Sequence, residues 1–129
     1  MIRVLLVDDQ ANIRRGLRMR LALETDIEIV GEAADGEAAL RMARLLAPTV
    51  VVMDVHMPIM DGIDATAALL KESAPPAVVA LSFYDDERTR ERALAAGAAA
   101  FVPKTCGHEY LVEAIRRAAG QDARTVPCS

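Results

Sequence analysis

The fold of this chain is decided by Thr49-Val50-Val51-Val52-Met53-Asp54, a short apolar run that ends abruptly at an acid. Residues 50–53 lack the alternation of apolar and polar side chains that marks a strand with one face in water. Both faces of this strand are therefore expected to be covered, as in parallel sheets that carry helices on both sides. We predict a strand over residues 49–53, with Asp54 at its carboxyl end.

Four more apolar runs have a similar character, and helical patterns lie between them. We predict the other strands over residues 2–7, 27–33, 77–81 and 99–102. Amphipathic helices are predicted over about 12–24, 35–46, 62–73 and 86–96, and a last helix is predicted after Gly107 and His108. Asn12 is expected to cap the first helix.

Five successive units of strand and helix favour a parallel sheet with helices on both faces, joined by right-handed crossovers. We predict an α/β fold with a doubly wound sheet of five parallel strands in the order 2-1-3-4-5 and with five helices. In such sheets the ligand site lies beyond the carboxyl ends of the strands, where the strand order reverses. The residues that directly follow the strands are therefore the candidates for a functional site.

Composition limits the classes of protein to which the chain can belong. Its 129 residues, 53% of them hydrophobic, suffice for one compact domain. The formal net charge of -4 argues against a domain that itself grips nucleic acid, because that work requires a basic face. No stretch is apolar enough for a membrane helix, so we expect a cytoplasmic protein without a membrane partner, in which Cys106 and Cys128 are free thiols.

Five polar residues follow the predicted strands at the same edge of the sheet. Asp8 and Asp9 follow the first strand, Asp54 the third, Ser82 the fourth and Lys104 the fifth. Three carboxylates at close range repel one another unless a cation lies among them. A few oxygen ligands completed by water describe a site for Mg²⁺, whereas Ca²⁺ takes more ligands.

Together these residues can carry phosphoryl chemistry. With a metal ion beside it, the Asp54 carboxylate can act as a nucleophile toward phosphorus and form an aspartyl phosphate. Ser82 can donate a hydrogen bond to one phosphoryl oxygen, and Lys104 can pair with another. Taken singly, each residue has a simpler explanation as a turn, a helix cap or a solvated charge, and only their convergence favours the functional interpretation.

The same residues carry a resemblance to a known family. The chain resembles the receiver domains of two-component response regulators through four motifs: Val7-Asp8-Asp9, Met53-Asp54-Val55-His56-Met57-Pro58-Ile59-Met60-Asp61-Gly62, Leu81-Ser82 and Phe101-Val102-Pro103-Lys104. The resemblance covers residues 1–120 and implies the flavodoxin-like fold of a receiver domain. Residues 121–129 are expected to be a tail, or the start of a linker to an output domain that this chain does not contain.

The resemblance implies a role for each matching acid. Asp54 corresponds to the phosphoacceptor. Asp8, Asp9 and Asp54, with the backbone carbonyl of His56, correspond to the ligands of Mg²⁺, with Asp9 the direct ligand of the acidic pair and Asp8 acting through water.

The resemblance also implies how phosphorylation is read. Ser82 and Lys104 match the hydroxyl and the lysine that bind the phosphoryl group. Ser82 and Phe101 match a switch pair, in which the aromatic ring turns inward when the hydroxyl is drawn to the phosphoryl group. The implied result is a shift between two conformations of the fourth helix, fifth strand and fifth helix.

A signalling switch, and not an enzyme with an external substrate, is the function that the resemblance implies. A sensor histidine kinase would supply the phosphoryl group, and the chain would catalyse only its own Mg²⁺-dependent phosphorylation and slow dephosphorylation. Residues 81–87 and 92–98 most resemble the receivers of LuxR/NarL-type transcriptional regulators. DNA contact is then expected only through an absent C-terminal domain, and a homodimer is a further expectation.

Two residues depart from the pattern of the family. Lys104 precedes Thr105, where many receivers have a proline after a cis peptide bond, so the isomer of this bond stays open. Phe83 is bulkier than the small residue common after the hydroxyl position. It is expected to narrow access to Asp54 or to cover the phosphoryl group.

Three other functions stay open at this point. A stand-alone receiver would act by protein-protein interaction. A phosphatase of the haloacid-dehalogenase type also uses an Asp nucleophile with Mg²⁺, but it needs a second Asp two residues later, where this chain has His56. A nucleotide- or flavin-binding module needs Gly, Ser or Thr after the first strand, whereas Asp8 and Asp9 repel phosphate.

Substitution of His56 or Tyr84 is expected to change the rate at which the phosphoryl group leaves Asp54, because in the resembling family these positions influence attack by water. The lifetime of the phosphorylated form is measured by intact mass after removal of the phosphodonor, for wild type, His56→Ala and Tyr84→Ala. Equal lifetimes in the three proteins would refute this hypothesis.

Overall fold

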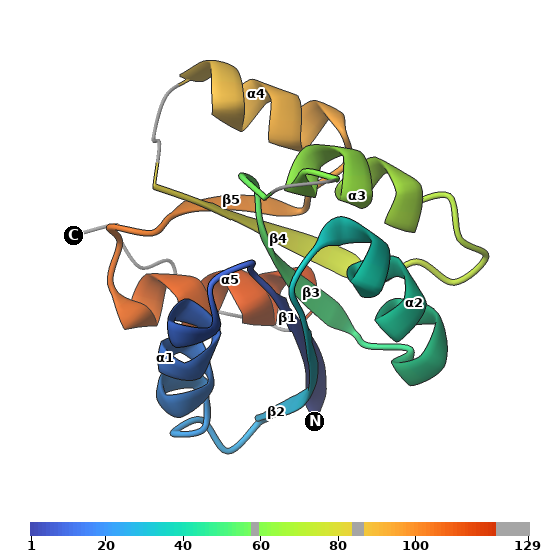
Figure 1. Ribbon diagram of the computed structural model, residues 1–129. Coiled ribbons are helices and arrows are strands. Elements are labelled where there is room, and N and C mark those ends of the chain that lie inside the picture. The colour runs from blue at the N-terminus through green and yellow to red at the C-terminus, as the bar shows by residue number, and fades with distance from the viewer. Residues whose placement is uncertain (58–59, 84–86, 121–129) are drawn as a thin grey trace.

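A five-stranded sheet forms the centre of the protein in the computed structural model, which describes residues 1–57, 60–83 and 87–120 (Figure 1). The strands are all parallel and lie in the order β2-β1-β3-β4-β5. Their bounds are β1 (Ile2–Val7), β2 (Ile27–Ala33), β3 (Val50–Asp54), β4 (Ala77–Ser82) and β5 (Ala100–Pro103). The predicted fold class and strand order are confirmed.

Helices alternate with these strands and cover both faces of the sheet. Their bounds are α1 (Ala11–Leu21), α2 (Gly36–Leu46), α3 (Gly62–Leu69), α4 (Glu87–Ala95) and α5 (His108–Ala118). α1 and α5 pack on one face, and α2, α3 and α4 pack on the other (Figure 1). All of β3 is therefore buried.

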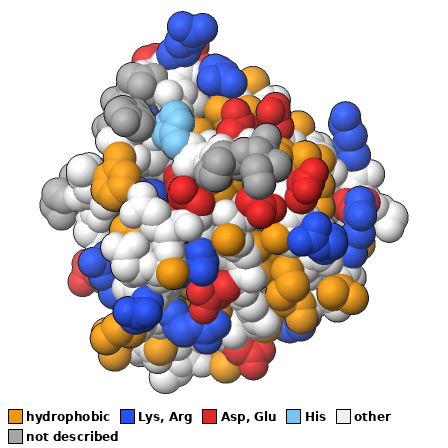
Figure 2. All heavy atoms as spheres, viewed as in Figure 1, with side chains coloured by type: hydrophobic (Ala, Val, Ile, Leu, Met, Phe, Trp, Pro, Cys, Tyr) orange, Lys and Arg blue, Asp and Glu red, His pale blue; other side chains and the backbone are white. Residues whose placement is uncertain are grey.

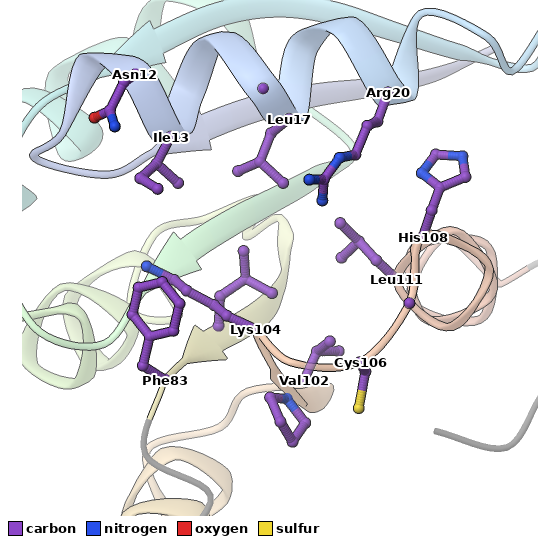
Figure 3. Close-up of a pocket in the computed structure, with 14 residues that line it drawn as sticks. Asn12, Ile13, Leu17, Arg20, Phe83, Val102, Lys104, Cys106, His108 and Leu111 are labelled. Carbon is purple, nitrogen blue, oxygen red and sulfur yellow. The ribbon is translucent and has the colours of Figure 1, made fainter. Parts of the chain in front are cut away.

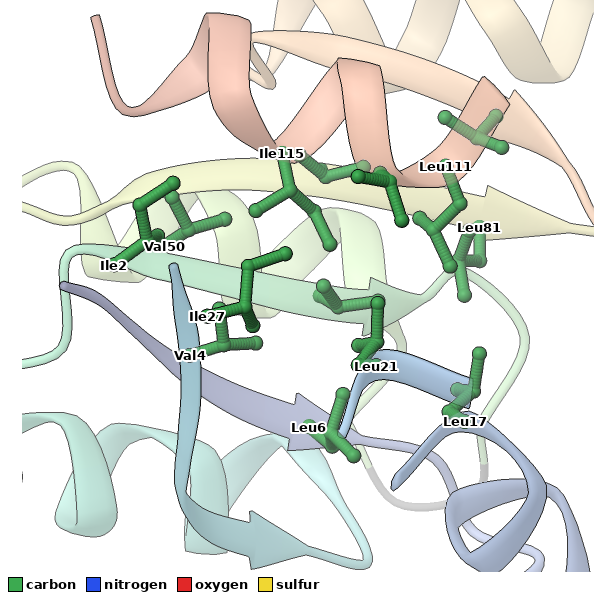
Figure 4. Packing of buried hydrophobic residues seen from close by; sticks show 14 residues of the cluster. Ile2, Val4, Leu6, Leu17, Leu21, Ile27, Val50, Leu81, Leu111 and Ile115 are labelled. Atoms are coloured by element: carbon green, nitrogen blue, oxygen red, sulfur yellow. The ribbon is translucent and has the colours of Figure 1, made fainter. Parts of the chain in front are cut away.

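The apolar run of β3 serves two separate cores, because successive residues of a strand point to opposite faces of a sheet. Val50 and Val52 join the cluster under α1 and α5, which includes Leu21 and Ile115 (Figure 4). Val51 and Met53 join the cluster under α2 and α3. A polar residue anywhere in this run would lie in one core or the other, so the run has to be continuously apolar.

Helix α1 differs from its predicted range at both ends. It begins at Ala11 with Gln10 at the N-cap position, so the capping role predicted for Asn12 is wrong. The Gln10 side chain makes no capping hydrogen bond. The helix ends at the buried Leu21 and not at residue 24, because the next large apolar residue, Leu23, is exposed and has no core to pack on.

Helix α3 is also shorter than predicted. Asp61 caps its start, since the Asp61 carboxylate accepts a hydrogen bond from Asp64 N at 2.9 Å. The helix ends at Leu69 and not at residue 73. Leu69 is fully buried and Lys71 is exposed, so the helix stops where its contact with the core stops.

Three smaller expectations can be compared with the structure. Cys106 is disulfide-bonded, so the expectation of a free thiol is wrong there; spacing along the chain does not reveal which sulfur atoms meet in space. Cys128 lies outside the described residues. The peptide bond between Lys104 and Thr105 is trans. Over the described ranges, no helix has the length and apolar character needed to cross a membrane.

The start of α3 packs directly against the end of β3. Gly62 N donates a hydrogen bond to Val55 O at 2.9 Å. A Cβ atom at position 62 would overlap the backbone oxygen of Asp54, so glycine permits this close approach.

Gly62→Ala is expected to lower the free energy of unfolding by about 1–3 kcal/mol, because the added methyl group meets rigid backbone. Gly16→Ala is the control, since no atom lies within 4 Å of a Cβ at this position in α1. That change is expected to raise the free energy of unfolding by about 0.5–1 kcal/mol. Urea denaturation measures both variants against wild type, and equal stability of the two variants would contradict the close packing.

Candidate functional site

Parallel strands bring the predicted acidic residues together at one edge of the sheet. Asp8 and Asp9 directly follow β1, and Asp54 ends the neighbouring strand β3. One carboxylate oxygen from each of the three lies within 4.8 Å of the other two. Asp8 and Asp54 are buried, whereas Asp9 is exposed.

Lys104 reaches this acidic cluster from the end of β5. Its Nζ atom lies 3.0 Å from Asp8 Oδ2 and 3.3 Å from Asp54 Oδ1. The backbone N–H of Lys104 donates to the Ser82 carbonyl at 2.7 Å, which fixes the start of the lysine side chain beside β4. Among the described residues, one ammonium group thus faces three carboxylates, and this cluster carries more negative than positive charge.

The Asp54 carboxylate is held in place although its charge is costly. Burial raises the pKa of the Asp54 carboxyl above its ordinary range; Lys104 opposes this shift, and the nearby charge of Asp8 adds to it. The backbone N–H of His56 donates to Asp54 Oδ1 at 3.2 Å and orients the group.

Ser82 and Phe101, the predicted switch pair, lie on β4 and β5. Ser82 is fully buried at the end of β4, where it pairs with Pro103. Phe101 is buried in the cluster between the sheet and helices α3 and α4, and the Arg90 guanidinium of α4 lies 6.0 Å from its ring centroid. Phe101 therefore lies on the α4 side of the sheet. Tyr84 lies outside the described residues.

Phe83 contacts the site in a way that the sequence did not reveal. Its bulk was the only sequence signal, whereas in the structure Lys104 Nζ lies 4.6 Å from the centroid of its ring, a cation–π contact. Figure 3 shows the ring beside the Lys104 side chain. Both residues line a cavity of about 220 Å³ that is bounded on its other sides by α1 and α5.

Arg14 is a second residue whose contact was missed. The Arg14 side chain is only 17% exposed and donates to the Asp8 carbonyl. A signal was present: Arg14 precedes Leu17 by three residues and Leu21 by seven, so the three side chains share one face of α1.

The donor set of this cluster fits a hard divalent cation. Carboxylate oxygens are the ligands that Mg²⁺ prefers, and three of them are available with one lysine to balance them. Figure 2 shows several acidic side chains close together in the upper half of the visible face, with Lys and Arg side chains spread among acidic and apolar ones around them. The residues present therefore fit a metal ion of this class.

Asp54→Asn is expected to raise the free energy of unfolding in Mg²⁺-free buffer near neutral pH, because it removes a buried carboxylate. The raised pKa of Asp54 means that the native state keeps this proton to a higher pH than the unfolded chain, so ionisation costs stability as the pH rises above the ordinary value of 3.8. The gain should therefore shrink as the pH falls to about 4 and below, where the unfolded chain also takes up the proton. Urea denaturation at the two pH values checks this, and an unchanged or lower stability at neutral pH would contradict it.

Sequence comparison assigns the chain to a protein family. The response regulator receiver domain family matches residues 4–116. The transcriptional regulatory protein LiaR of Bacillus subtilis is 42% identical over 119 residues, which cover 92% of this chain and 56% of LiaR. The response regulator GacA of Pseudomonas aeruginosa is 41% identical over 122 residues, which cover 94% of this chain and 57% of GacA. The chain thus spans a little over half the length of these curated relatives.

Solved structures agree with this likeness. The receiver domain of the response regulator NarL from Mycobacterium tuberculosis superposes with a TM-score of 0.88 at 34% identity, over 94% of this chain and 98% of that one. A LuxR-family two-component response regulator from Aurantimonas has a TM-score of 0.87 at 32% identity, over 95% of this chain and 88% of that one. Because the match spans nearly the whole chain in both sequence and fold, the chain belongs to the response regulator receiver domain family of two-component systems, and within it resembles the receivers of LuxR/NarL-type regulators.

Proposed function

We propose that the chain is a phosphorylation-dependent switch, in which Asp54 accepts a phosphoryl group from a phosphohistidine of a sensor histidine kinase. One observation carries the proposal: the buried Asp54 carboxylate lies beside Asp8 and Asp9 and 3.3 Å from Lys104. A nucleophile for phosphorus, ligands for a divalent cation and a charge partner for phosphoryl oxygens are thereby next to one another.

The transfer makes one bond and breaks one. A carboxylate oxygen of Asp54 bonds to phosphorus while the bond from phosphorus to the imidazole nitrogen breaks, and the nitrogen keeps the electron pair. The three acids and the backbone carbonyl of His56 would hold Mg²⁺, which draws charge from the phosphoryl oxygens when bound. Lys104 then exchanges its contact with Asp54 for a phosphoryl oxygen, and Ser82 donates a hydrogen bond to another.

Phosphorylation adds about −1.5 to −2 of charge at neutral pH, and this change is proposed to be read by Ser82 and Phe101. As the hydroxyl moves toward the phosphoryl group, Phe101 follows and shifts α4, β5 and α5. The Arg90 contact with the Phe101 ring supports a link to α4. Partners, a second copy of the chain among them, would bind this surface.

A transcriptional output is proposed from the relatives. LiaR is a transcriptional regulatory protein, and this chain covers 56% of its length. We infer that residues 1–120 are the receiver domain of a cytoplasmic regulator whose DNA-binding domain is not in this chain. Residues 121–129 would be its tail or linker, and they lie outside the described residues. A stand-alone receiver that acts by protein-protein interaction is the alternative.

Turnover of external phosphoesters is not expected. A haloacid-dehalogenase phosphatase needs an Asp two residues after its nucleophile, and His56 stands there. Catalysis would be limited to the chain's own Mg²⁺-dependent phosphorylation and slow dephosphorylation, with His56 and Tyr84 influencing the second rate.

Incubation with acetyl phosphate and Mg²⁺ is expected to add about 80 Da to the chain, the mass of one phosphoryl group. Intact mass spectrometry measures the addition, and peptide mapping locates it at Asp54. Asp54→Asn and a sample with excess EDTA are the controls, and both should stay unmodified. Absence of labelling in wild type, equal labelling of Asp54→Asn, or rapid turnover of many phosphoesters would overturn the proposal.

A further inference from the structure

Arg14 joins α1 to the end of β1 and to β2. Its Nη1 atom donates to the backbone oxygen of Asp8 at 2.5 Å, and its Nε atom donates to Glu32 Oε1 at 2.9 Å. The side chain is 17% exposed, so solvent has little access to these contacts. One guanidinium group thus connects the first helix, an edge strand and the loop that carries the acidic pair.

The hydrogen bond from Arg14 completes the hydrogen bonding of the Asp8 backbone. The Asp8 N–H donates to Ala33 O on β2 at 3.1 Å. Strand β1 pairs with β3 only as far as Val7, so the Asp8 carbonyl lies beyond the end of that ladder. Arg14 supplies the donor that a buried carbonyl requires.

The Asp8 carbonyl sets the direction of Asp9, because a peptide unit is planar. Once the Asp8 oxygen is held, the nitrogen and Cα of Asp9 are held as well. Asp9 is exposed, and no side chain in the described ranges donates a hydrogen bond to its carboxylate. The place of the Asp9 carboxylate therefore depends on its backbone, and through it on Arg14.

We propose that Arg14 is a positioning residue for the metal site: by holding the Asp8 carbonyl, it directs Asp9 toward a divalent cation and raises the affinity for Mg²⁺. This inference rests on the proposed function, since it requires that Asp8, Asp9 and Asp54 bind Mg²⁺.

The charge of Arg14 and its hydrogen bond to the Asp8 carbonyl have opposite effects on the affinity for a metal ion. A positive charge near a metal site weakens metal binding by repulsion, so loss of the charge alone would strengthen it. Glu32 offsets this charge: burial works against its ionisation, but hydrogen bonds from Arg18 and Arg14 keep its pKa below the ordinary value. A lower Mg²⁺ affinity after removal of Arg14 would therefore be caused by the changed position of Asp9 and not by the loss of a positive charge.

Isothermal titration calorimetry with Mg²⁺ on the 129-residue chain tests the proposal. Arg14→Ala is expected to weaken binding by about tenfold, the scale seen when a group that orients metal ligands is removed. Arg14→Lys keeps the charge and can still donate to one of the two acceptors, so it should lose less. Wild-type or tighter affinity in Arg14→Ala would overturn the inference.

Arg18→Ala is the matched control. Arg18 lies one turn later on α1 and binds Glu32 Oε2 at 2.8 Å, so its removal takes away the same charge and leaves the Arg14 contact with Asp8. We expect its Mg²⁺ affinity to equal or slightly exceed that of wild type, and a loss equal to that of Arg14→Ala would refute the positioning role.

Two further results separate the possible failures. Far-UV circular dichroism establishes that each variant is folded. If Arg14→Ala does not fold, Arg14→Met takes its place, because methionine keeps an apolar side chain of similar length but has no hydrogen-bond donor; wild-type affinity in that variant would then overturn the inference. Absence of Mg²⁺ binding in wild type would refute the metal site of the proposed function, and the role of Arg14 would fall with it.

Discussion

In the part of the chain that the structure describes, one ammonium group faces three carboxylates at the carboxyl edge of the sheet, and the chemistry of the site depends on this imbalance of charge. Lys104 pairs with Asp8 and Asp54 from a third strand, so the charges are balanced only in part. Buried strands hold these groups close together. Burial of the apolar strand residues stabilises the fold, and this stability offsets the repulsion among the carboxylates. The remaining negative charge gives a divalent cation a physical reason to bind.

Much of this arrangement could be predicted because it follows from strand geometry. The run from Val50 to Met53 is apolar at every position, and a strand with that pattern needs cover on both faces. Parallel strands end at one edge, so Asp8, Asp54 and Lys104 had to meet there once the strand order was predicted. The apolar pattern of the strands and their order in the sheet together thus locate the acidic cluster.

Helix ends and individual contacts could not be predicted in this way, because they depend on what packs against each residue. Leu23 lies within the range predicted for the first helix, but it is 76% exposed, since no core lies beneath it. The spacing of Arg14 to Leu17 and Leu21 places it on the buried face of α1, but the backbone oxygen that it contacts depends on how α1 packs beside the end of β1. Phe83 is recognisable in the sequence as bulky, but its contact with Lys104 depends on the path of the chain after β4.

The exposed ring of Phe83 contacts Lys104, which forms a buried ion pair with Asp54. Its ring faces the ammonium of Lys104, yet the residue is 56% exposed. Any exchange of partners by the lysine either carries the ring with it or breaks their contact. Under the proposed function, a change of partner by Lys104 would therefore reach an exposed aromatic side chain, which another macromolecule can contact without entering the site.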